Sequence, residues 1–243
     1  MQKNVLITGA AKRIGATCAR FLHAEGCNII LHYRSSLDDA ELLCAELNKI
    51  RADSTVLIQA DLLNVVELHA LVDKASEVWG GVDVLVNNAS AFYPTVFADV
   101  SEAQWDELMG SNLKAPFFLA KALSSILLKK QGCIVNIVDI HADRGLKDYS
   151  VYSIAKAGLV AMTKVLAKEL GPLVRVNAVA PGAILWPEAD VSEADKQATL
   201  QRVVLNRSGD ASDIAKAVWF LIANADYMTG QVLTVDGGRT LNY

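Results

Sequence analysis

The sequence has 243 residues, of which 52% are hydrophobic and 21% are charged, and its formal net charge is −4. This composition indicates an ordered globular protein with a buried core, and it lacks the basic footprint of a nucleic-acid-binding protein. The four cysteines form no CxxC pair and have no histidine at ligand spacing, so we expect free thiols and no metal site. We also expect no signal peptide and no membrane span, and therefore a cytoplasmic protein.

Strands and helices alternate along the whole chain. We expect strands at residues 4–8, 28–33, 55–59, 82–86, 133–138, 175–180 and 231–235. We expect helices at residues 16–25, 38–48, 64–79, 101–130, 150–170 and 210–223, with an irregular segment from 183 to about 193. No linker interrupts this alternation, which is typical of a parallel sheet with helices on both faces. The sequence therefore predicts one doubly wound α/β domain over residues 1–243.

A turn with two glycines follows the first expected strand, where residues 9–15 read GAAKRIG. Backbone N–H groups at the start of the next helix can bind a pyrophosphate, and small residues let it approach. Between a buried strand and a helix, this turn predicts a dinucleotide-binding site. The alternative is an ordinary turn between a strand and a helix.

The second expected strand ends in Tyr33-Arg34-Ser35, without the carboxylate that would bind the adenosine ribose of NAD. A guanidinium can form a charge-assisted fork to a phosphate, and serine hydroxyls add donors. Arg34 therefore predicts a 2′-phosphate and hence NADP. A solvated arginine after a strand is the alternative.

Tyr152 and Lys156 are four residues apart in the expected helix 150–170, so their side chains share one helical face. A lysine ammonium beside a phenol is expected to lower the pKa of the tyrosine, which can then transfer protons near neutral pH. The alternative is a surface tyrosine and lysine at this spacing by chance.

Further motifs follow in order: Asp61, Asn87-Asn88-Ala89, Asn112, Pro181-Gly182 and the VDGG of residues 235–238. Together with the glycine turn and the YSIAK segment, they resemble the short-chain dehydrogenase/reductase family over essentially the whole chain. The resemblance implies a seven-stranded parallel sheet and hydride transfer with nicotinamide. It also implies that Tyr152 is the acid/base and that Lys156 holds the tyrosine and the ribose. Asn112 matches the asparagine that props a proton-relay water, or is a polar residue satisfied within a helix kink.

Two residues depart from the general family pattern. Arg13 replaces the middle glycine of TGxxxGxG, and Asp139 stands where the family has its catalytic serine, thirteen residues before Tyr152. A carboxylate is a poor substitute for a hydroxyl that only hydrogen-bonds a ketone. It suits a substrate that needs a proton at a ring nitrogen or that offers N–H donors.

These departures, together with the segment ASAFYPT at 89–95 and Tyr33-Arg34-Ser35, resemble the pteridine reductases within the family. The resemblance implies cofactor contacts by Gly9, Arg13, Ile14, Tyr33, Arg34, Ser35, Asp61, Leu62, Asn88, Ala89, Ser90, Tyr152, Lys156, Pro181 and Gly182. It implies substrate contacts by Arg13, Ser90, Phe92, Asp139 and Tyr152. The catalytic set is then Asn112, Asp139, Tyr152 and Lys156, with Phe92 stacking on the pterin.

The resulting hypothesis is NADPH-dependent reduction of dihydropterins, with dihydrofolate and oxidised pterins as further candidate substrates. Hydride goes to the C=N carbon, and Tyr152 or Asp139 protonates the adjacent nitrogen. Asp139 as a purely structural cap is an alternative at the residue level. At the level of function, the alternatives are a carbonyl reductase of 3-oxoacyl thioesters and a non-catalytic NADP-binding regulator.

A few features stay outside this hypothesis. The substrate loop is expected around residues 183–198, where Trp186 is a candidate substrate contact. His141 is a candidate neighbour of Asp139, whereas His23, His32 and His69 are expected to be structural or solvated. The apolar faces of helices 101–130 and 150–170 resemble those that form subunit contacts in this family, so we expect a homotetramer.

Overall fold

The computed structural model describes residues 2–185 and 192–242, which contain one seven-stranded parallel sheet in the order β3-β2-β1-β4-β5-β6-β7. The strands are β1 (Asn4–Ile7), β2 (Asn28–Tyr33), β3 (Thr55–Gln59), β4 (Val84–Asn87), β5 (Cys133–Ile137), β6 (Arg175–Pro181) and β7 (Val232–Val235). Each neighbouring pair is parallel. The predicted doubly wound α/β fold is thereby confirmed.

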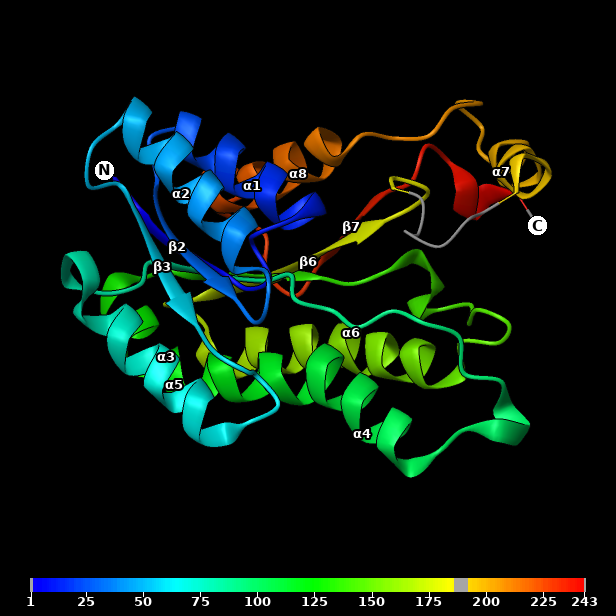
Figure 1. Cartoon of the computed structure of the whole chain (residues 1–243), viewed down its shortest axis with the longest axis horizontal. Coiled ribbons are helices and arrows are strands. Elements are labelled where there is room, and N and C mark those ends of the chain that lie inside the picture. The colour runs from blue at the N-terminus through cyan, green and yellow to red at the C-terminus, as the bar shows by residue number, and fades with distance from the viewer. Residues whose placement is uncertain (1, 186–191, 243) are drawn as a thin grey trace.

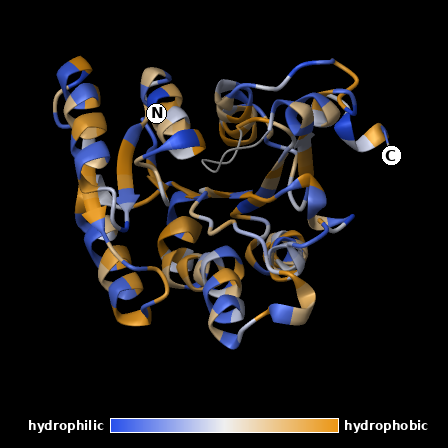
Figure 2. Ribbon diagram, turned by 45° about the vertical axis from the view of Figure 1, so that its right-hand side comes forward, coloured by the Kyte–Doolittle hydropathy of each residue, from blue (hydrophilic) through white to orange (hydrophobic). Residues whose placement is uncertain are grey.

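Helices cover both faces of the sheet (Figure 1). One face carries α1 (Arg13–Ala24), α2 (Leu37–Ile50) and α8 (Ala211–Ala223), and the other carries α3 (Val65–Glu77), α5 (Ala115–Lys130) and α6 (Ser150–Leu170). Two shorter helices, α4 (Glu102–Met109) and α7 (Glu193–Leu200), lie outside these layers. The hydrophobic sides of the helices turn towards the sheet in Figure 2, as expected where both sheet faces are buried.

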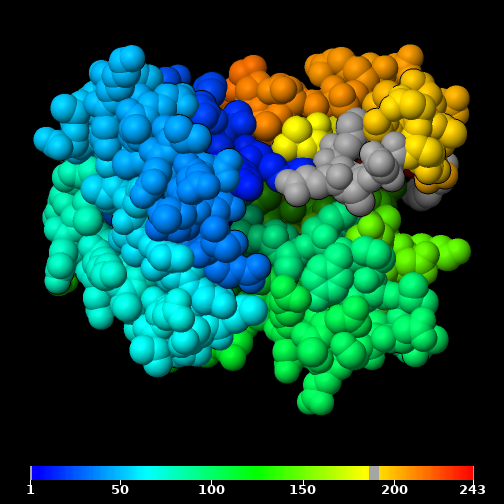
Figure 3. All heavy atoms as spheres, viewed as in Figure 1, coloured from blue at the N-terminus to red at the C-terminus, as the bar shows by residue number. Residues whose placement is uncertain are grey.

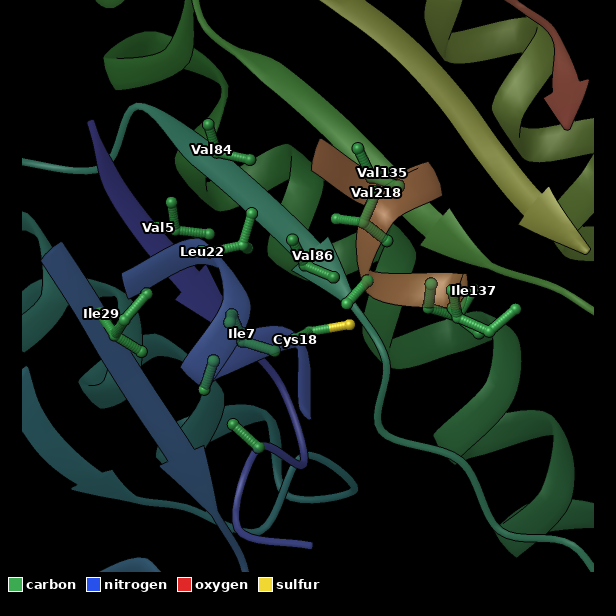
Figure 4. Close-up of a cluster of buried hydrophobic side chains, with 14 of the residues drawn as sticks. Val5, Ile7, Cys18, Leu22, Ile29, Val84, Val86, Val135, Ile137 and Val218 are labelled. Carbon is green, nitrogen blue, oxygen red and sulfur yellow. The ribbon is translucent and has the colours of Figure 1, made fainter. Parts of the chain in front are cut away.

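The central strands alternate their side chains between two cores. Val5 and Ile7 of β1 pack with Leu22 of α1 and Val218 of α8, as Figure 4 shows, whereas Leu6 packs on the opposite face. All three β1 side chains are fully buried. Because close-packed cores hold strand ends in fixed positions, loops at those ends are carried on a rigid support.

The order of the strands reverses beside β1. The chain runs outward through β2 and β3, then returns to β4 on the other side of β1 and continues to β7. In open parallel sheets, ligands bind outside the carboxyl ends of the strands at such a switch point.

The helix predicted over 101–130 is interrupted, which corrects the sequence analysis. A π-helical segment, Gly110–Lys114, separates α4 from α5, and Pro116 stands in the first turn of α5. Proline has no amide hydrogen to donate, so a regular helical ladder cannot run through this position. Asn112 lies in this segment, fully buried, and its side-chain amide donates to the carbonyl of Leu108 at 3.0 Å. The helix kink considered for Asn112 is therefore present.

Two other expectations need correction. Part of the segment expected to be a substrate loop, 183–198, belongs to α7, whose first turn is capped by the Ser192 hydroxyl accepting from the Asp195 N–H at 3.1 Å. Helix α6 reaches the length and mean hydropathy of a membrane span, although no such run was expected. Within the described residues, 56% of its most apolar window is buried inside the domain, so packing against the sheet accounts for its apolar residues.

Candidate active site

A cavity of about 600 Å³ opens at the carboxyl ends of the strands. All seven strands send residues that follow them into its wall, from Gly9 after β1 to Arg239 after β7. In Figure 3 the blue residues that follow β1 lie beside the yellow ones that follow β6. The wall brings together nearly all of the predicted site residues: Gly9, Arg13, Ile14, Tyr33, Arg34, Ser35, Asp61, Leu62, Asn88, Ala89, Ser90, Phe92, Asp139, Tyr152, Lys156, Pro181 and Gly182. Asn112 lies behind this wall.

The glycine turn is shaped by close backbone contacts. Gly9 has a φ of +61°, and a Cβ on Gly15 would lie 2.4 Å from the Gly9 carbonyl oxygen. The Asn88 side-chain amide donates to the carbonyls of Thr8 at 2.9 Å and Gly9 at 3.0 Å, tying the end of β4 to the turn. Helix α1 begins beside this turn with no side-chain cap hydrogen bond, and its start faces the cavity. An anion at this helix start would meet the N–H groups that an α-helix leaves unpaired.

His32 fixes the same turn from β2. Its Nδ1 accepts a hydrogen bond from the Gly9 N–H at 3.1 Å, and its Nε2 lies 3.0 Å from the Ala60 carbonyl. The ring is therefore neutral, with the proton on Nε2. Burial lowers the pKa of His32 to about 4, although the hydrogen bond to Ala60 and the charge of Asp61 oppose this shift. His32 was expected from the sequence to be structural or solvated, and the structure adds a specific partner for it within the glycine turn.

The end of β2 presents cationic and hydroxyl groups to the cavity. Arg34 and Ser35 are exposed there, while Tyr33 is buried. The Gln59 side-chain amide of β3 donates to the Arg34 carbonyl at 2.9 Å and so holds the backbone at this position. Asp61 follows β3, and its Oδ1 accepts from the Leu63 N–H at 3.0 Å. The guanidinium of Arg34 can bind a phosphate. Asp61 and Leu62 also line the cavity.

The chemical centre of the cavity is the pair Asp139 and Tyr152. The Tyr152 hydroxyl donates to Asp139 Oδ2 at 2.9 Å, and Asp139 Oδ1 accepts from the His141 N–H at 2.8 Å. The carboxylate thus caps the short turn Ile140–Ala142 and also contacts the predicted acid/base. Lys156, from the same helix as Tyr152, is buried, and its Nζ donates to the Ile137 carbonyl at 2.9 Å.

The pKa of Tyr152 shifts in the direction opposite to the one expected from Lys156. Burial, together with the charge and hydrogen bond of Asp139, raises the pKa of Tyr152 well above its ordinary value. Lys156 Nζ lies 5.6 Å from the centre of the tyrosine ring, and burial lowers the pKa of Lys156 to about 8. Burial and the charge and hydrogen bond of Asp139 all favour the neutral phenol. In this protein Tyr152 is a protonated phenol at neutral pH.

Aromatic rings form the next part of the wall. Phe92 is 43% exposed, stacks on Tyr149 with ring centres 4.7 Å apart, and meets Tyr152 edge-on at 4.8 Å. The hydroxyl of the neighbouring Ser90 donates to the Asn112 Oδ1 at 2.6 Å. Asn112 therefore orients a wall residue from behind, and Phe92 presents a flat apolar surface beside the reactive pair.

Several wall residues were not singled out from the sequence, among them Ile184, Leu185, Thr199 and Arg239. Arg239 could have been found by the rule that ligands bind beyond the carboxyl ends of parallel strands, because it follows the VDGG turn after β7. His141 also lines the cavity, and burial lowers its pKa while Asp139 opposes this. Trp186 lies outside the described residues. Within those residues, no group of three or more His, Cys, Asp or Glu side chains could hold a metal ion.

Comparison with known proteins identifies the family. The family model described as Enoyl-(Acyl carrier protein) reductase matches residues 9–240. Pteridine reductase 1 of Leishmania tarentolae is 36% identical over 277 aligned residues, covering 97% of this chain and 96% of that protein. The 3-oxoacyl-[acyl-carrier-protein] reductase FabG of Staphylococcus epidermidis is 35% identical over 242 residues, covering 98% and 99%. Nodulation protein G of a Rhizobium species (strain N33) is 36% identical over 243 residues, covering 98% and 97%.

These relatives are about equally similar to the chain, so the identities alone do not select a substrate. They agree in covering nearly its full length, and the parallel sheet with a cavity at its strand ends agrees with them. The chain belongs to the short-chain dehydrogenase/reductase family and is an oxidoreductase.

Proposed function

We propose that the protein is an NADPH-dependent pteridine reductase, which reduces dihydropterins to their tetrahydro forms. One observation carries the proposal: the Asp139 carboxylate and the Tyr152 hydroxyl form a 2.9 Å hydrogen bond in the wall of the cavity. A carboxylate can accept from the N–H groups of a heterocycle, which a ketone does not offer. The 36% identity to Pteridine reductase 1 supports the same substrate class.

The residues that line the cavity support the binding of a dinucleotide with a 2′-phosphate. The closely packed Gly9–Gly15 turn and the start of α1 suit the pyrophosphate, because a Cβ on Gly15 would collide with the Gly9 carbonyl. Arg34 and Ser35 would hold the 2′-phosphate, and no carboxylate follows β2 directly to compete with it. Asp61, Leu62, Asn88, Ala89, Pro181 and Gly182 would border the remaining cofactor. NADPH, when bound, supplies the hydride.

The chain's own residues handle the proton. Tyr152 is protonated at neutral pH because burial and Asp139 raise its pKa, so it can donate to a ring nitrogen next to the reduced carbon. Asp139 accepts from the hydroxyl and can accept from substrate N–H groups. Lys156 carries a cationic amine beneath this pair and would hold the ribose hydroxyls.

Substrate orientation falls to three other wall residues. The exposed ring of Phe92 can stack on a flat pterin, and it lies edge-on to Tyr152. Ser90 and Arg13 would contact the pyrimidine edge and the phosphates, since both line the cavity near the glycine turn. This set is compatible with dihydrofolate and oxidised pterins as additional substrates.

A second candidate is reduction of 3-oxoacyl thioesters. It is favoured by the 35% identity to the FabG reductase over 98% of the chain. The Asp139 carboxylate argues against it, because a ketone oxygen gains from a donor such as serine and loses from an ionised acceptor. A non-catalytic regulator is a third candidate, although it would have no need for the Asp139–Tyr152–Lys156 arrangement.

The test is a substrate panel with purified protein. NADPH oxidation is followed in the presence of 7,8-dihydrobiopterin or of acetoacetyl coenzyme A, with NADH as the cofactor control. We expect turnover with NADPH and the dihydropterin. Turnover with the thioester alone would select the carbonyl reductase, and cofactor binding without turnover of either would select the regulator.

We also propose a cytoplasmic homotetramer assembled through α5 and α6. These helices, with the end of α4 and the segment Gly110–Lys114, border an apolar groove of about 440 Å³ lined by Met109, Leu113, Phe117, Met162, Val165 and Leu166. Phe117 and Val165 are 43% and 53% exposed in the single chain. Exposed apolar surface of this kind is typical of subunit contacts.

A further inference from the structure

Arg239 is a half-buried arginine at the far end of the cavity from Arg34. It begins the short turn Arg239–Leu241 that follows β7, whereas Arg34 follows β2. Five strand spacings separate β2 from β7, or about 24 Å in a sheet with neighbours about 4.8 Å apart. Asp139 follows β5, only two spacings from β7. The chemical centre therefore lies between Arg34 and Arg239, so Arg239 faces the substrate and not the adenosine end of the cofactor.

Among the described residues, the guanidinium of Arg239 has charged neighbours but no hydrogen-bond or ion-pair partner. Asp139 and Asp236 are the carboxylates whose charges act on it, and Arg202 is a nearby cation. Both oxygens of Asp236 already accept from backbone N–H groups, of Gly238 at 2.9 Å and Thr240 at 2.7 Å. Asp139 accepts from Tyr152 and His141 and, within the described residues, forms no hydrogen bond or ion pair with Arg239. No hydrogen bond or ion pair to the Arg239 guanidinium forms within residues 2–185 and 192–242, so its donors are available to a ligand.

The backbone that carries Arg239 is held firmly. The Gly182 N–H donates to the Val235 carbonyl at 2.9 Å, and a Cβ on Gly182 would lie 2.6 Å from the Asp236 Cα. On the other side, the Arg144 guanidinium donates to the Thr240 carbonyl. A cation on a fixed turn loses little conformational freedom when it binds an anion. The apolar side chains of Ile184 and Leu185 line the same cavity, and apolar lining strengthens a charged contact where it excludes water.

We propose that Arg239 is a specificity-determining residue that binds an anionic group, a carboxylate or a phosphate, on a substrate substituent remote from the reduced bond. The inference rests on the proposed function only in taking Asp139 and Tyr152 as the reaction centre. Among pterins, Arg239 would favour substrates whose side chain ends in a carboxylate over substrates with a neutral side chain. The same contact would serve the phosphates of a coenzyme A thioester, and the experiment separates the two sources.

The experiment compares two pairs of substrates that differ in the charge of the remote substituent. 7,8-Dihydrofolate is paired with the neutral 7,8-dihydrobiopterin, and acetoacetyl coenzyme A with the neutral ethyl acetoacetate. Arg239→Gln should raise KM for the charged member of the pair in use by about tenfold, as for loss of a charge-assisted contact. Both kcat and KM for the neutral member should stay within about twofold, because Arg239 lies away from the reduced bond. Arg239→Lys should recover part of the loss, and Arg202→Gln, at an exposed position outside the cavity wall, should behave as the wild type.

Each other result overturns a specific statement. Equal losses with charged and neutral members would mean that Arg239 acts through Asp139, and an unchanged KM would mean that it does not contact the substituent. Turnover of the thioester pair alone would reject the proposed function. The comparison of KM for acetoacetyl coenzyme A and ethyl acetoacetate would then still test the role of Arg239. If neither pair is reduced, equilibrium binding of folic acid and biopterin to the NADP⁺-saturated protein decides. Equal folic acid affinity in the wild type and Arg239→Gln then overturns the inference.

Discussion

At the scale of single residues, Asp139 has the largest effect on its neighbours. It accepts from the Tyr152 hydroxyl and raises the pKa of both Tyr152 and Lys156. The Tyr152 hydroxyl thereby stays protonated. Lys156, whose pKa is about 8, loses its charge as the pH rises above that value. The titrating group in the neutral to alkaline range is therefore the lysine and not the tyrosine.

This assignment predicts the pH profile of Asp139→Asn. In the wild type, kcat/KM for NADPH should fall as the pH rises through about 8, because deprotonated Lys156 no longer attracts the ribose hydroxyls. Asp139 raises the pKa of Lys156, so its removal should move this fall to a lower pH. Turnover of dihydrobiopterin should also drop by roughly a hundredfold, as for loss of a proton-transfer group. Steady-state rates between pH 6 and pH 10 would measure both effects.

Asp143→Asn, an exposed residue a few positions along the same loop, is the matched control and should retain the wild-type profile. If kcat/KM for NADPH fell at the same alkaline pH in Asp139→Asn as in the wild type, the charge of Asp139 would not influence Lys156.

The sequence indicated the identity of most wall residues but not their electrostatic balance. Tyr152 and Lys156 were recognisable from their spacing together with the other family motifs. The direction of the tyrosine pKa shift, however, depends on burial and on a carboxylate thirteen residues away. Arg239 was missed although it directly follows the VDGG motif of residues 235–238. Its place in the cavity comes from the strand order, which brings the end of β7 to the same edge as β5.

At the scale of elements, β2 acts as a connector between its two neighbours. His32 on this strand accepts from the Gly9 N–H after β1 and donates to the Ala60 carbonyl after β3. The bond from Gly9 requires the neutral ring, since a protonated imidazole has no acceptor for the Gly9 N–H, whereas the bond to Ala60 needs only the Nε2 proton. Acid should therefore break the contact between β2 and the glycine turn after β1 through one side chain.

This contact predicts an acid-dependent loss of stability. The folded pKa of His32 is about 4, below an ordinary value of 6.5, so between these values the unfolded chain binds more protons and stability rises with pH. Lowering the pH from 7.5 to 5 should cost about 2 kcal/mol of unfolding free energy from this residue. In His32→Gln that part of the loss should vanish, which urea unfolding at the two pH values would measure.

The exposed His69 provides the control, because His69→Gln should keep the acid-dependent loss of the wild type. An identical loss in wild type and His32→Gln would refute the role of the buried ring.

The alternation of strands and helices predicted the elements well, and three of them, β2, β3 and α6, have the expected bounds. The exceptions have local physical causes. The break at Gly110–Lys114 depends on Asn112 finding partners in Ala91 and Leu108, one of them distant in sequence. Helix α7 is short and mostly polar, so its hydrophobic pattern is weak, and its capping serine was the available signal.

At the scale of the whole molecule, the apolar groove on α5 and α6 predicts the state of assembly. Val165→Glu places a charge on this face, which should dissociate the proposed tetramer because an unpaired carboxylate in an apolar contact is costly. Light scattering should give four times the monomer mass for the wild type and the monomer mass for the variant. Ile50→Glu, at a 72% exposed position ending α2, should remain tetrameric. A monomeric wild type would contradict the proposal directly.

The cavity is walled by the ends of all seven strands, and this gives it a role beyond chemistry. A ligand inside it touches both halves of the sheet, the one that winds outward from β1 and the one that winds outward from β4. Unfolding of either half of the sheet would remove part of the binding site, and the free energy of ligand binding would be lost. Occupancy therefore opposes unfolding of the entire domain, by about 2.7 kcal/mol when the ligand is present at a hundred times its Kd. The ligands of this oxidoreductase therefore stabilise the whole fold. Without them, the protein should unfold at a lower temperature and be cleaved more readily by proteases.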